Sequence, residues 1–331
     1  MNNDLAEIPA EIGQYKTLKE ISSGSYGLVI QVQHKTTKVE YACKIVSRQQ
    51  LSDKNVFQCF EQELRIHERL THQNVVKLVE IIYEENYIFV ILELCEKQSL
   101  YDYLSNSDYS YQRFLKKITY QLCNAVDYIH SKGVIHHDIK PENILLDVNM
   151  NTKLADFGCA TEQNRSPTNF NGTLGYAAPE LVDQDSPYSD GPKIDIWSIG
   201  ITVYTLANGV VPWRNVEEFY QRIFEDDYSF LQELSPDISE FVAACLKVNP
   251  NERPTAAQLK DFEWIKNVKK LPAAKKAVNR SYGVSSSYKD EGGKKKNLLV
   301  RGIGDKSVVL NMIPKTNRCK SSIRLIRASV L

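Results

Sequence analysis

The sequence predicts an α+β protein in which a β-rich part precedes a larger helical part. Short segments rich in β-branched and aromatic residues, typical of strands, fill the chain from Tyr15 to about Leu92. Beyond Leu92, apolar residues recur at the 3.6-residue spacing of a helix over longer stretches. A run of strands followed by a run of helices is typical of the α+β class.

Five strands are expected in the first part. They lie around Leu18–Ile21, Leu28–Val32, Glu40–Val46, Val75–Tyr83 and Tyr87–Leu92. The turn between the first two contains Ser22, Gly24 and Gly27, and glycine lets backbone N–H groups approach a phosphate closely. Most hairpins of this kind are only turns, so the loop by itself is weak evidence for a nucleotide site.

Lys44 and Glu63 stand out as charged residues within apolar segments. Lys44 ends a predicted strand, where an unpaired ammonium group would be costly. Glu63 follows nineteen residues later, in a segment whose apolar residues share one face of a helix. The ordinary alternative for Glu63 is a solvated position on the exposed face of that helix.

The second part contains three longer predicted helices. They cover residues 114–129, 195–207 and 238–246, and a shorter helix ends near Ile265. Gly133 and Gly209 are the expected stop residues of the first two. The helix at 195–207 is apolar on nearly all sides, which predicts that it is buried.

A polar stretch from His136 to Asn143 lies between two short apolar runs, and the sequence is organised around it. Within six positions it holds a carboxylate, an ammonium and an amide: Asp138, Lys140 and Asn143. A loop held between two buried strands can present these groups to a hydroxyl, a phosphate and a metal ion, respectively. Ten residues past the second apolar run, Asp156-Phe157-Gly158 provides a second carboxylate on a turn.

These two loops, followed by Ala178-Pro179-Glu180, resemble the catalytic and magnesium loops of the eukaryotic protein kinases. The resemblance covers about residues 15–265 and is greatest for the calcium/calmodulin-dependent and checkpoint kinase group. It implies a two-lobed fold, with a small N-terminal antiparallel sheet plus one helix (about 15–94) and a larger, mainly helical lobe (about 95–265). It also implies ATP and Mg²⁺ as cofactors and protein substrates with Ser/Thr acceptors, not nucleic acid.

The resemblance assigns roles to individual residues. Asp138 would accept the proton of the acceptor hydroxyl, Lys140 would meet the γ-phosphate, and Asn143 and Asp156 would hold Mg²⁺. The Lys44–Glu63 pair would position the ATP phosphates. The remaining nucleotide contacts would come from Ser22, Gly24, Gly27, Val29, Ala42, Glu93, Cys95 and Leu145. Core packing explains Val29, Ala42 and Leu145 equally well.

The sequence departs from the family pattern at three places. Ser22 stands where the phosphate loop usually has glycine. His137 stands where most of these kinases have an arginine that binds a phosphorylated activation-loop residue, which predicts weak dependence on phosphorylation there. Glu142 is present, but Ser99 and Thr205 replace two acids of kinases that prefer basic substrates. A preference for arginine before the acceptor is therefore open, as is the alternative of a catalytically inactive scaffold that only binds partners.

Charge is distributed unevenly along the chain. Residues 265–331 carry 17 Lys and Arg against 3 Asp and Glu, whereas the remainder carries 24 basic and 38 acidic residues. An acidic body with a basic tail predicts that the tail, 266–331, contacts the body or an acidic partner, and an autoinhibitory contact is one form of this. A solvated, disordered tail is the alternative. The first 14 residues are expected to be a short leader.

The seven cysteines are scattered and odd in number, which is typical of reduced intracellular thiols. No signal peptide or apolar run of membrane-spanning length is recognisable in the sequence. We therefore expect a monomer in the cytoplasm, with the nucleus as an alternative location because of the lysine clusters in the tail.

Overall fold

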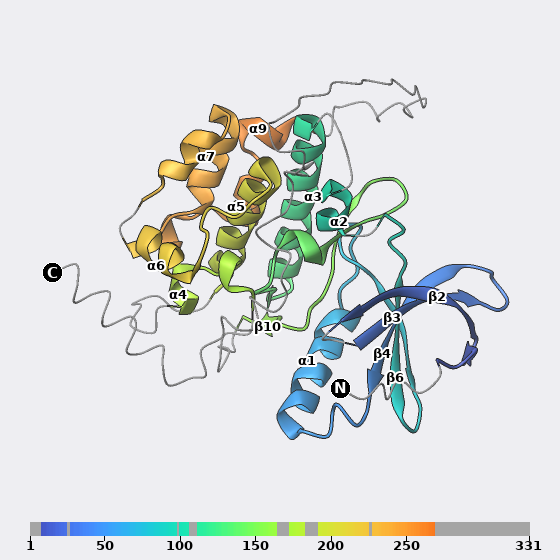
Figure 1. The fold of residues 1–331 in the computed structure, drawn as a ribbon. Helices are drawn as coiled ribbons and strands as arrows, with labels where there is room; N and C mark the ends of the chain where they lie inside the picture. Colours follow the sequence, from blue (N-terminus) through green and yellow to red (C-terminus); the bar gives the residue numbers. More distant parts are fainter. Residues whose placement is uncertain are drawn as a thin grey trace, which may run out of the picture.

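The computed structural model describes residues 8–24, 27–97, 99–105, 111–163, 172–182, 191–224 and 227–268. The chain forms a sheet-containing lobe and a larger helical lobe, which lie side by side (Figure 1). This is the α+β, two-lobed arrangement that the sequence predicts. The predicted basic tail beyond Val268 and the first seven residues of the leader lie outside the described residues.

The N-terminal lobe is built on one antiparallel sheet of six strands. Their order across the sheet is β1 (Glu11–Ile12), β2 (Tyr15–Gly24), β3 (Gly27–His34), β4 (Glu40–Ser47), β6 (Tyr87–Glu93) and β5 (Leu78–Tyr83). The sheet starts earlier than expected, because β1 lies within the predicted leader and pairs with β2. Ile12 is fully buried against the sheet, which explains why two residues suffice to fix this strand.

The single helix of this lobe, α1 (Lys54–Glu68), covers one face of the sheet (Figure 1). Asp53 caps its N-terminus by accepting from the backbone N–H groups of Asn55 (2.8 Å) and Val56 (3.3 Å). Phe60 and Leu64 are buried in a small core with strands β4, β5 and β6. One apolar face of the helix is thereby bound to the sheet, as its spacing predicts.

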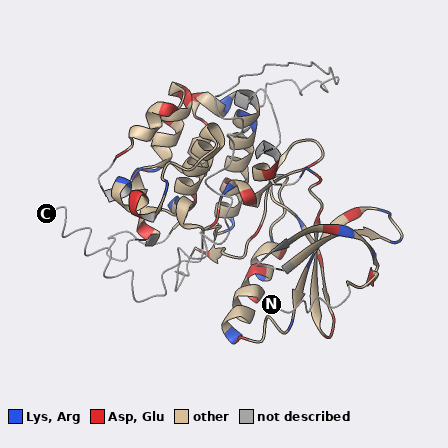
Figure 2. Cartoon of the chain, viewed as in Figure 1, with Lys and Arg blue, Asp and Glu red and all other residues tan. Residues whose placement is uncertain are grey.

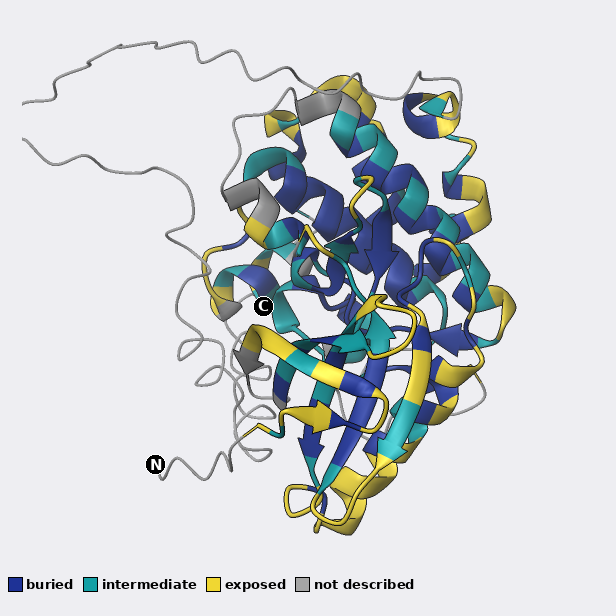
Figure 3. Ribbon diagram, turned by 90° about the vertical axis from the view of Figure 1, so that its right-hand side faces the viewer, coloured by how far each residue is buried: buried dark blue, intermediate teal, exposed yellow. Residues whose placement is uncertain are grey.

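The C-terminal lobe is mainly helical. Its helices are α2 (Leu100–Ser105), α3 (Tyr111–Ser131), α4 (Pro179–Val182), α5 (Lys193–Asn208), α6 (Val216–Phe224), α7 (Pro236–Cys245), α8 (Ala256–Leu259) and α9 (Glu263–Lys266). Helix α5 is buried along most of its length, and buried segments fill the interior of the helical lobe (Figure 3). Helix α5 is also almost free of charged residues (Figure 2), having only Lys193 and Asp195. Gly209 ends it in the left-handed conformation, with φ of 80°.

The described residues also form four short strands and four 3₁₀ turns. The strands are β7 (Val134–Ile135), β8 (Ile144–Leu146), β9 (Thr152–Leu154) and β10 (Thr161–Glu162). The turns are η1 (Pro141–Asn143), η2 (Leu174–Tyr176), η3 (Ser229–Glu233) and η4 (Pro250–Glu252). Strand β7 pairs with β10 and β8 with β9, so the polar loop at 136–143 lies between two buried strands, β7 and β8, as predicted.

A buried ion pair joins distant parts of the helical lobe. Arg253 forms a two-pronged contact with Glu180, at 2.6 and 2.8 Å, and both side chains are almost completely buried. The Arg253 guanidinium also donates to three backbone carbonyl groups and lies over the Trp197 ring. Its hydrogen-bonding capacity is thus used within the fold, which is the condition for a stable buried charge.

No helix in the described part of the chain is both long and apolar enough to span a bilayer.

Candidate active site

Asp138 lies at the centre of a closed hydrogen-bond network in the polar loop. Its Oδ1 accepts from the backbone N–H (3.0 Å) and the hydroxyl (2.7 Å) of Thr173. Its Oδ2 accepts from Lys140 Nζ (2.7 Å) and Asn143 Nδ2 (2.9 Å). Lys140 Nζ also donates to Thr173 Oγ1 at 2.6 Å. The fold thus brings the three predicted catalytic residues together and adds Thr173, which follows in the chain 35 residues after Asp138.

The charges of Asp138 and Lys140 stabilise each other. Burial raises the pKa of the Asp138 carboxyl, but the Lys140 charge and the hydrogen bonds from Lys140 and Thr173 outweigh burial and bring this pKa below its usual value. Burial lowers the pKa of Lys140, and the Asp138 charge reverses that effect and raises it above the usual value. The pair is therefore ionised at neutral pH.

A second aspartate, Asp195, holds the backbone of this loop. It lies in the first turn of α5, fully buried, and accepts from the backbone N–H groups of His136 (2.8 Å) and His137 (2.9 Å). The His130 Nε2 contacts the same carboxylate at 2.8 Å. His137 has φ of 66°, a left-handed conformation that costs a non-glycine residue about 1–3 kcal/mol. The contacts from Asp195 maintain this strained conformation.

The His137 side chain points into the protein. Its Nε2 lies 2.8 Å from Thr161 Oγ1 on β10, and the residue is only 6% exposed. Burial lowers the pKa of this imidazole, so it is neutral at pH 7. A neutral, buried imidazole cannot replace an arginine as a binding group for a phosphorylated side chain.

Asn143 and Asp156 carry side-chain oxygen atoms and lie on neighbouring segments of the backbone. The Asn143 side-chain nitrogen donates to the backbone oxygen (2.8 Å) and carboxylate of Asp138, so its amide oxygen is the atom that can bind a cation. The Ala155 N–H donates to the Asn143 carbonyl at 2.9 Å, which places Asp156 beside it. Carboxylate and amide oxygens are the ligands that Mg²⁺ prefers. Among the described residues no group of three or more acidic, histidine or cysteine side chains forms a metal site, so an ion here would need further oxygens from a ligand.

The predicted pair between Lys44 and Glu63 is present. Lys44 Nζ on β4 and Glu63 Oε1 on α1 are 2.6 Å apart, and both side chains are largely buried. A Cβ atom added to Gly158 would lie 3.6 Å from Glu63 Oε2 and 3.2 Å from Asp156 Oδ1. The pair is therefore next to the Asp156-Phe157-Gly158 turn, and the absence of a side chain at Gly158 permits this approach.

Phe157 fixes that turn against both lobes. It is fully buried, with its ring 4.8 Å from the ring of His67 on α1 and 5.0 Å from that of His136 in the polar loop. His67 Nε2 contacts the Val76 carbonyl at 2.7 Å. Burial lowers the pKa of His67 to about 4, so the ring is neutral. The tilted contact of His67 with Phe157 and the edge-to-face contact of Phe157 with His136 hold α1 against the C-terminal lobe.

The predicted nucleotide-contacting residues lie on the sheet and on β8. In the β2–β3 hairpin, Ser22 is opposite Val29, and Gly24 is opposite Gly27 at the tip. Val29 is paired with Lys44 across β3 and β4, so the hairpin and the lysine belong to one continuous surface. Ala42 and Leu145 are half-buried, on β4 and β8.

Glu93 and Cys95 lie in the connection between the lobes. The Glu93 carboxylate forms an ion pair with Lys153 and accepts from the Lys77 N–H at 3.2 Å. Because its carboxylate is engaged in these contacts, Glu93 can contact a nucleotide base only through its backbone carbonyl. Burial raises the pKa of the Cys95 thiol to about 12, so the thiol remains protonated and its residue likewise contributes through the backbone.

Two functional residues are absent from the sequence-based site. Thr173 bonds directly to Asp138 and Lys140; the sequence associates Thr173 with the serine/threonine form of the loop but does not indicate these contacts. His67 contacts Phe157, but a histidine at an apolar helical position gives no sequence signal of that contact.

Together, the two-lobed fold, the ionised Asp138–Lys140 pair and the paired Lys44 define a site suited to handling phosphate groups. A family model described as the protein kinase domain matches residues 15–265. The chain belongs to the protein kinase domain family, which confirms the resemblance predicted from its loops.

Curated proteins similar to the chain are named as serine/threonine kinases. Serine/threonine-protein kinase SIK2 of Gallus gallus is 30% identical over 261 residues, covering 78% of this chain and 32% of the relative. Serine/threonine-protein kinase SIK1 of Rattus norvegicus is 30% identical, covering 78% and 33%. The protein of that name from Mus musculus is 29% identical over the same shares. The chain spans about a third of the length of these relatives.

Proposed function

We propose that this chain transfers the γ-phosphoryl group of ATP to serine and threonine hydroxyls of proteins. The observation that carries the proposal is the closed network of Asp138, Lys140, Asn143 and Thr173. It places an acceptor carboxylate and an ammonium donor next to each other on a strained, rigidly anchored loop. The alternative of an inactive scaffold does not explain why all four side chains meet in one network.

Asp138 has the position and the charge to orient an acceptor hydroxyl. Because its pKa is below the usual value, it is a weak base, and its main contribution is to align the hydroxyl and to accept the proton late in the reaction. Lys140, 2.7 Å away, is a fixed positive charge that can stabilise the negative charge of the transferring group.

The nucleotide and the metal fit the remaining groups. Lys44, aligned by Glu63, would hold the phosphates of ATP, and the Asn143 amide oxygen and the Asp156 carboxylate would hold Mg²⁺. Magnesium bound there would neutralise phosphate charge and fix its orientation. The buried Phe157 keeps Asp156 in place, and the backbone of Glu93 and Cys95 would bind the base.

The serine/threonine preference follows from Thr173 and Lys140. Lys140 is followed by Pro141-Glu142, as in the serine/threonine form of this loop, and Thr173 contacts Lys140 directly at 2.6 Å. The names of the curated relatives support the same acceptor class.

The neutral His137 supports activity without activation-loop phosphorylation. Because its imidazole is buried against Thr161, a phosphate on Ser166 or Thr168 would not be bound by it. We expect Ser166→Ala and Thr168→Ala each to retain kcat/KM within about fivefold of the parent, which is the size of one exposed charge contact. A loss of 100-fold or more in either variant would contradict this expectation.

The catalytic assignment can be tested with a matched pair of variants. Asp138→Asn keeps the size of the side chain and removes its charge, whereas Asp261→Asn makes the same change at an exposed position in the helical lobe. With Mg-ATP and a serine peptide, Asp138→Asn should lose at least about 100-fold in kcat, in the range of a general acid–base contribution. Asp261→Asn should match the parent. Equal activity in all three proteins would refute the role of Asp138.

A further inference from the structure

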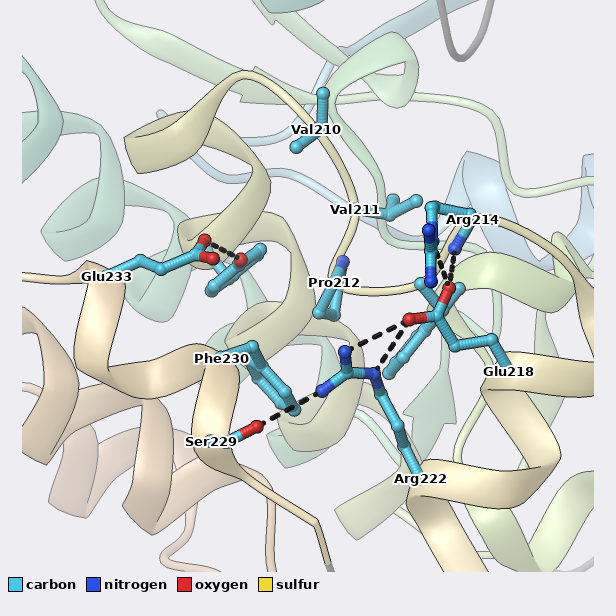
Figure 4. Close-up of a pocket in the computed structure, with 11 residues that line it drawn as sticks. Val210, Val211, Pro212, Arg214, Glu218, Arg222, Ser229, Phe230 and Glu233 are labelled. Atoms are coloured by element: carbon cyan, nitrogen blue, oxygen red, sulfur yellow. Dashed lines mark hydrogen bonds and ion pairs between the residues drawn. The ribbon is translucent and has the colours of Figure 1, made fainter.

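A pocket of about 270 Å³ opens on the helical lobe between the end of α5, the start of α6 and the η3 turn (Figure 4). Val211, Pro212, Trp213 and Phe230 form an apolar part of its lining, and the polar part includes Arg214, Glu218, Arg222, Ser229 and Glu233. The volume is below the range of about 300–1,000 Å³ that is usual for pockets of small-molecule ligands. It fits an apolar side chain or two from a docked peptide segment better than a metabolite.

The rim of the pocket carries an internal network of charges (Figure 4). Glu218 accepts from Arg214 Nε and from Arg222 Nε and NH2, at 3.0–3.1 Å. Arg222 also pairs with Asp227 at 3.0 Å. Both arginines of the rim are thus neutralised by carboxylates of the same region.

The surroundings of the pocket consequently have an acidic surplus. Residues 210–240 contain eight Asp and Glu but only two basic residues, Arg214 and Arg222. The exposed acids among the described residues of this region are Glu217, Glu233, Asp237 and Glu240. Val210, at the rim, is 46% exposed and apolar. The natural occupant should therefore combine apolar side chains with positive charge.

The end of this same chain has that composition. Residues 323–331 read Ile-Arg-Leu-Ile-Arg-Ala-Ser-Val-Leu, with two arginines and no acid. The whole stretch 269–331 has 16 Lys and Arg against 3 Asp and Glu. We propose that the pocket binds the chain's own C-terminal segment, with Leu325 and Ile326 against the apolar part of the lining and Arg324 and Arg327 facing the exposed acids Glu217 and Glu233.

The start of the tail is close enough for this contact. Helix α9, which precedes the tail, packs against α7, and η3, which forms one wall of the pocket, packs against the same helix. Helix α7 has 10 residues and is therefore about 15 Å long. The number of residues from 269 to 322 is 54, and a random coil of that length has a root-mean-square span of about 40 Å, which exceeds the distance to be bridged. The segment is thus present at high effective concentration.

The pocket is also next to a segment of the proposed active site. The Trp213 indole nitrogen would be 3.7 Å from a Cβ atom added to Gly175, in the η2 turn that follows Thr173. An occupant that contacts Trp213 is therefore separated by the indole ring from the η2 turn, which follows Thr173 of the proposed active site.

The contact can be tested by crosslinking in the full chain, with no need for catalysis. Val210 would be replaced by the photoreactive amino acid p-benzoylphenylalanine, and crosslinked peptides would be identified by mass spectrometry. We expect crosslinks to residues 323–331 within the monomer fraction, at a yield independent of protein concentration. The double variant Leu325→Asp, Ile326→Asp should reduce this yield at least about fivefold, because the apolar anchor is lost.

A matched control makes the same change elsewhere in the tail. The double variant Val309→Asp, Leu310→Asp should leave the crosslink yield unchanged. Crosslinks confined to dimers would show that a second copy is the occupant and would overturn the proposal. Crosslinks to other tail residues, equal loss in both double variants, or no crosslink to the tail would overturn it as well. These readouts do not depend on phosphate transfer, so they are independent of the proposed activity.

Discussion

Removing the Thr173 hydroxyl should weaken catalysis while leaving ATP binding intact. In Thr173→Ala, Asp138 loses the 2.7 Å hydrogen bond from that hydroxyl, and Lys140 loses its 2.6 Å acceptor. The backbone N–H of residue 173 still donates to Asp138. A hydrogen bond to a charged group contributes about 1.5–3 kcal/mol, which corresponds to a loss of about 10- to 150-fold in kcat.

The pH dependence of Thr173→Ala provides a second readout. The hydrogen bond from Thr173 helps to keep the pKa of Asp138 below its usual value, so its removal should raise that pKa. Activity requires the carboxylate, so the acidic limb of the kcat/KM profile should move to higher pH in the variant. Thr173→Ser retains the hydroxyl and serves as the matched control.

Steady-state kinetics on the parent, Thr173→Ala and Thr173→Ser would test the role of the Thr173 hydroxyl. We expect the KM for ATP to be unchanged, because the Lys44–Glu63 pair does not contact Thr173, and we expect Thr173→Ser to be within about threefold of the parent. Full activity in Thr173→Ala would refute the reasoning. So would a serine variant that is as impaired as the alanine variant.

Three further predictions concern stability and specificity. Arg253→Met should lower the free energy of unfolding by about 3–5 kcal/mol, because it leaves the Glu180 carboxylate buried without its partner. Thermal denaturation would measure this loss of stability. A change below about 1 kcal/mol would contradict the prediction. His67 has a pKa of about 4 in the folded state against 6.5 as its usual value, so stability should fall as pH decreases from 6.5 to 4. Protonation of His67 in the unfolded state should lower the free energy of unfolding by about 2 kcal/mol between pH 7.5 and 5. Urea denaturation should show this decrease in the parent but not in His67→Leu. An equal dependence of the unfolding free energy on pH in both proteins would refute it. Glu142 has a buried carboxylate oxygen without a hydrogen-bond partner, and burial raises its pKa, so a basic substrate residue that pairs with it should be favoured. Glu142→Gln should reduce the preference for peptides with arginine before the acceptor about tenfold, and an unaltered preference would count against this role.

The sequence predicts the architecture well because each element has a local signal. Helix α5 ends at Gly209 where a left-handed residue is required, and its uninterrupted apolar surface correctly indicates burial. The polar loop is predictable for the same reason, since short apolar strands on both sides fix Asp138 between them. The Lys44–Glu63 pair was accessible only by resemblance, because their contact joins a strand to a helix.

The contacts that the sequence does not predict depend on packing between residues that are far apart in the chain. Thr173 meets Asp138 across 35 positions, and nothing in either segment alone specifies the contact. The rings of His67 and Phe157 are in contact because α1 lies against the Asp156-Phe157-Gly158 turn, which depends on the tertiary structure. The early start of the sheet has a similar origin, since Ile12 becomes a strand residue only by pairing with Tyr15.

The most direct test of the account is transfer of labelled γ-phosphate from Mg-ATP to a mixed pool of serine, threonine and tyrosine peptides. The full chain would be produced in a host without other protein kinases, beside Asp156→Asn. We predict label on serine and threonine peptides with the parent and essentially none with the variant. Binding of Mg-ATP by the parent with no transfer to any peptide or protein acceptor would contradict the account and identify an inactive scaffold.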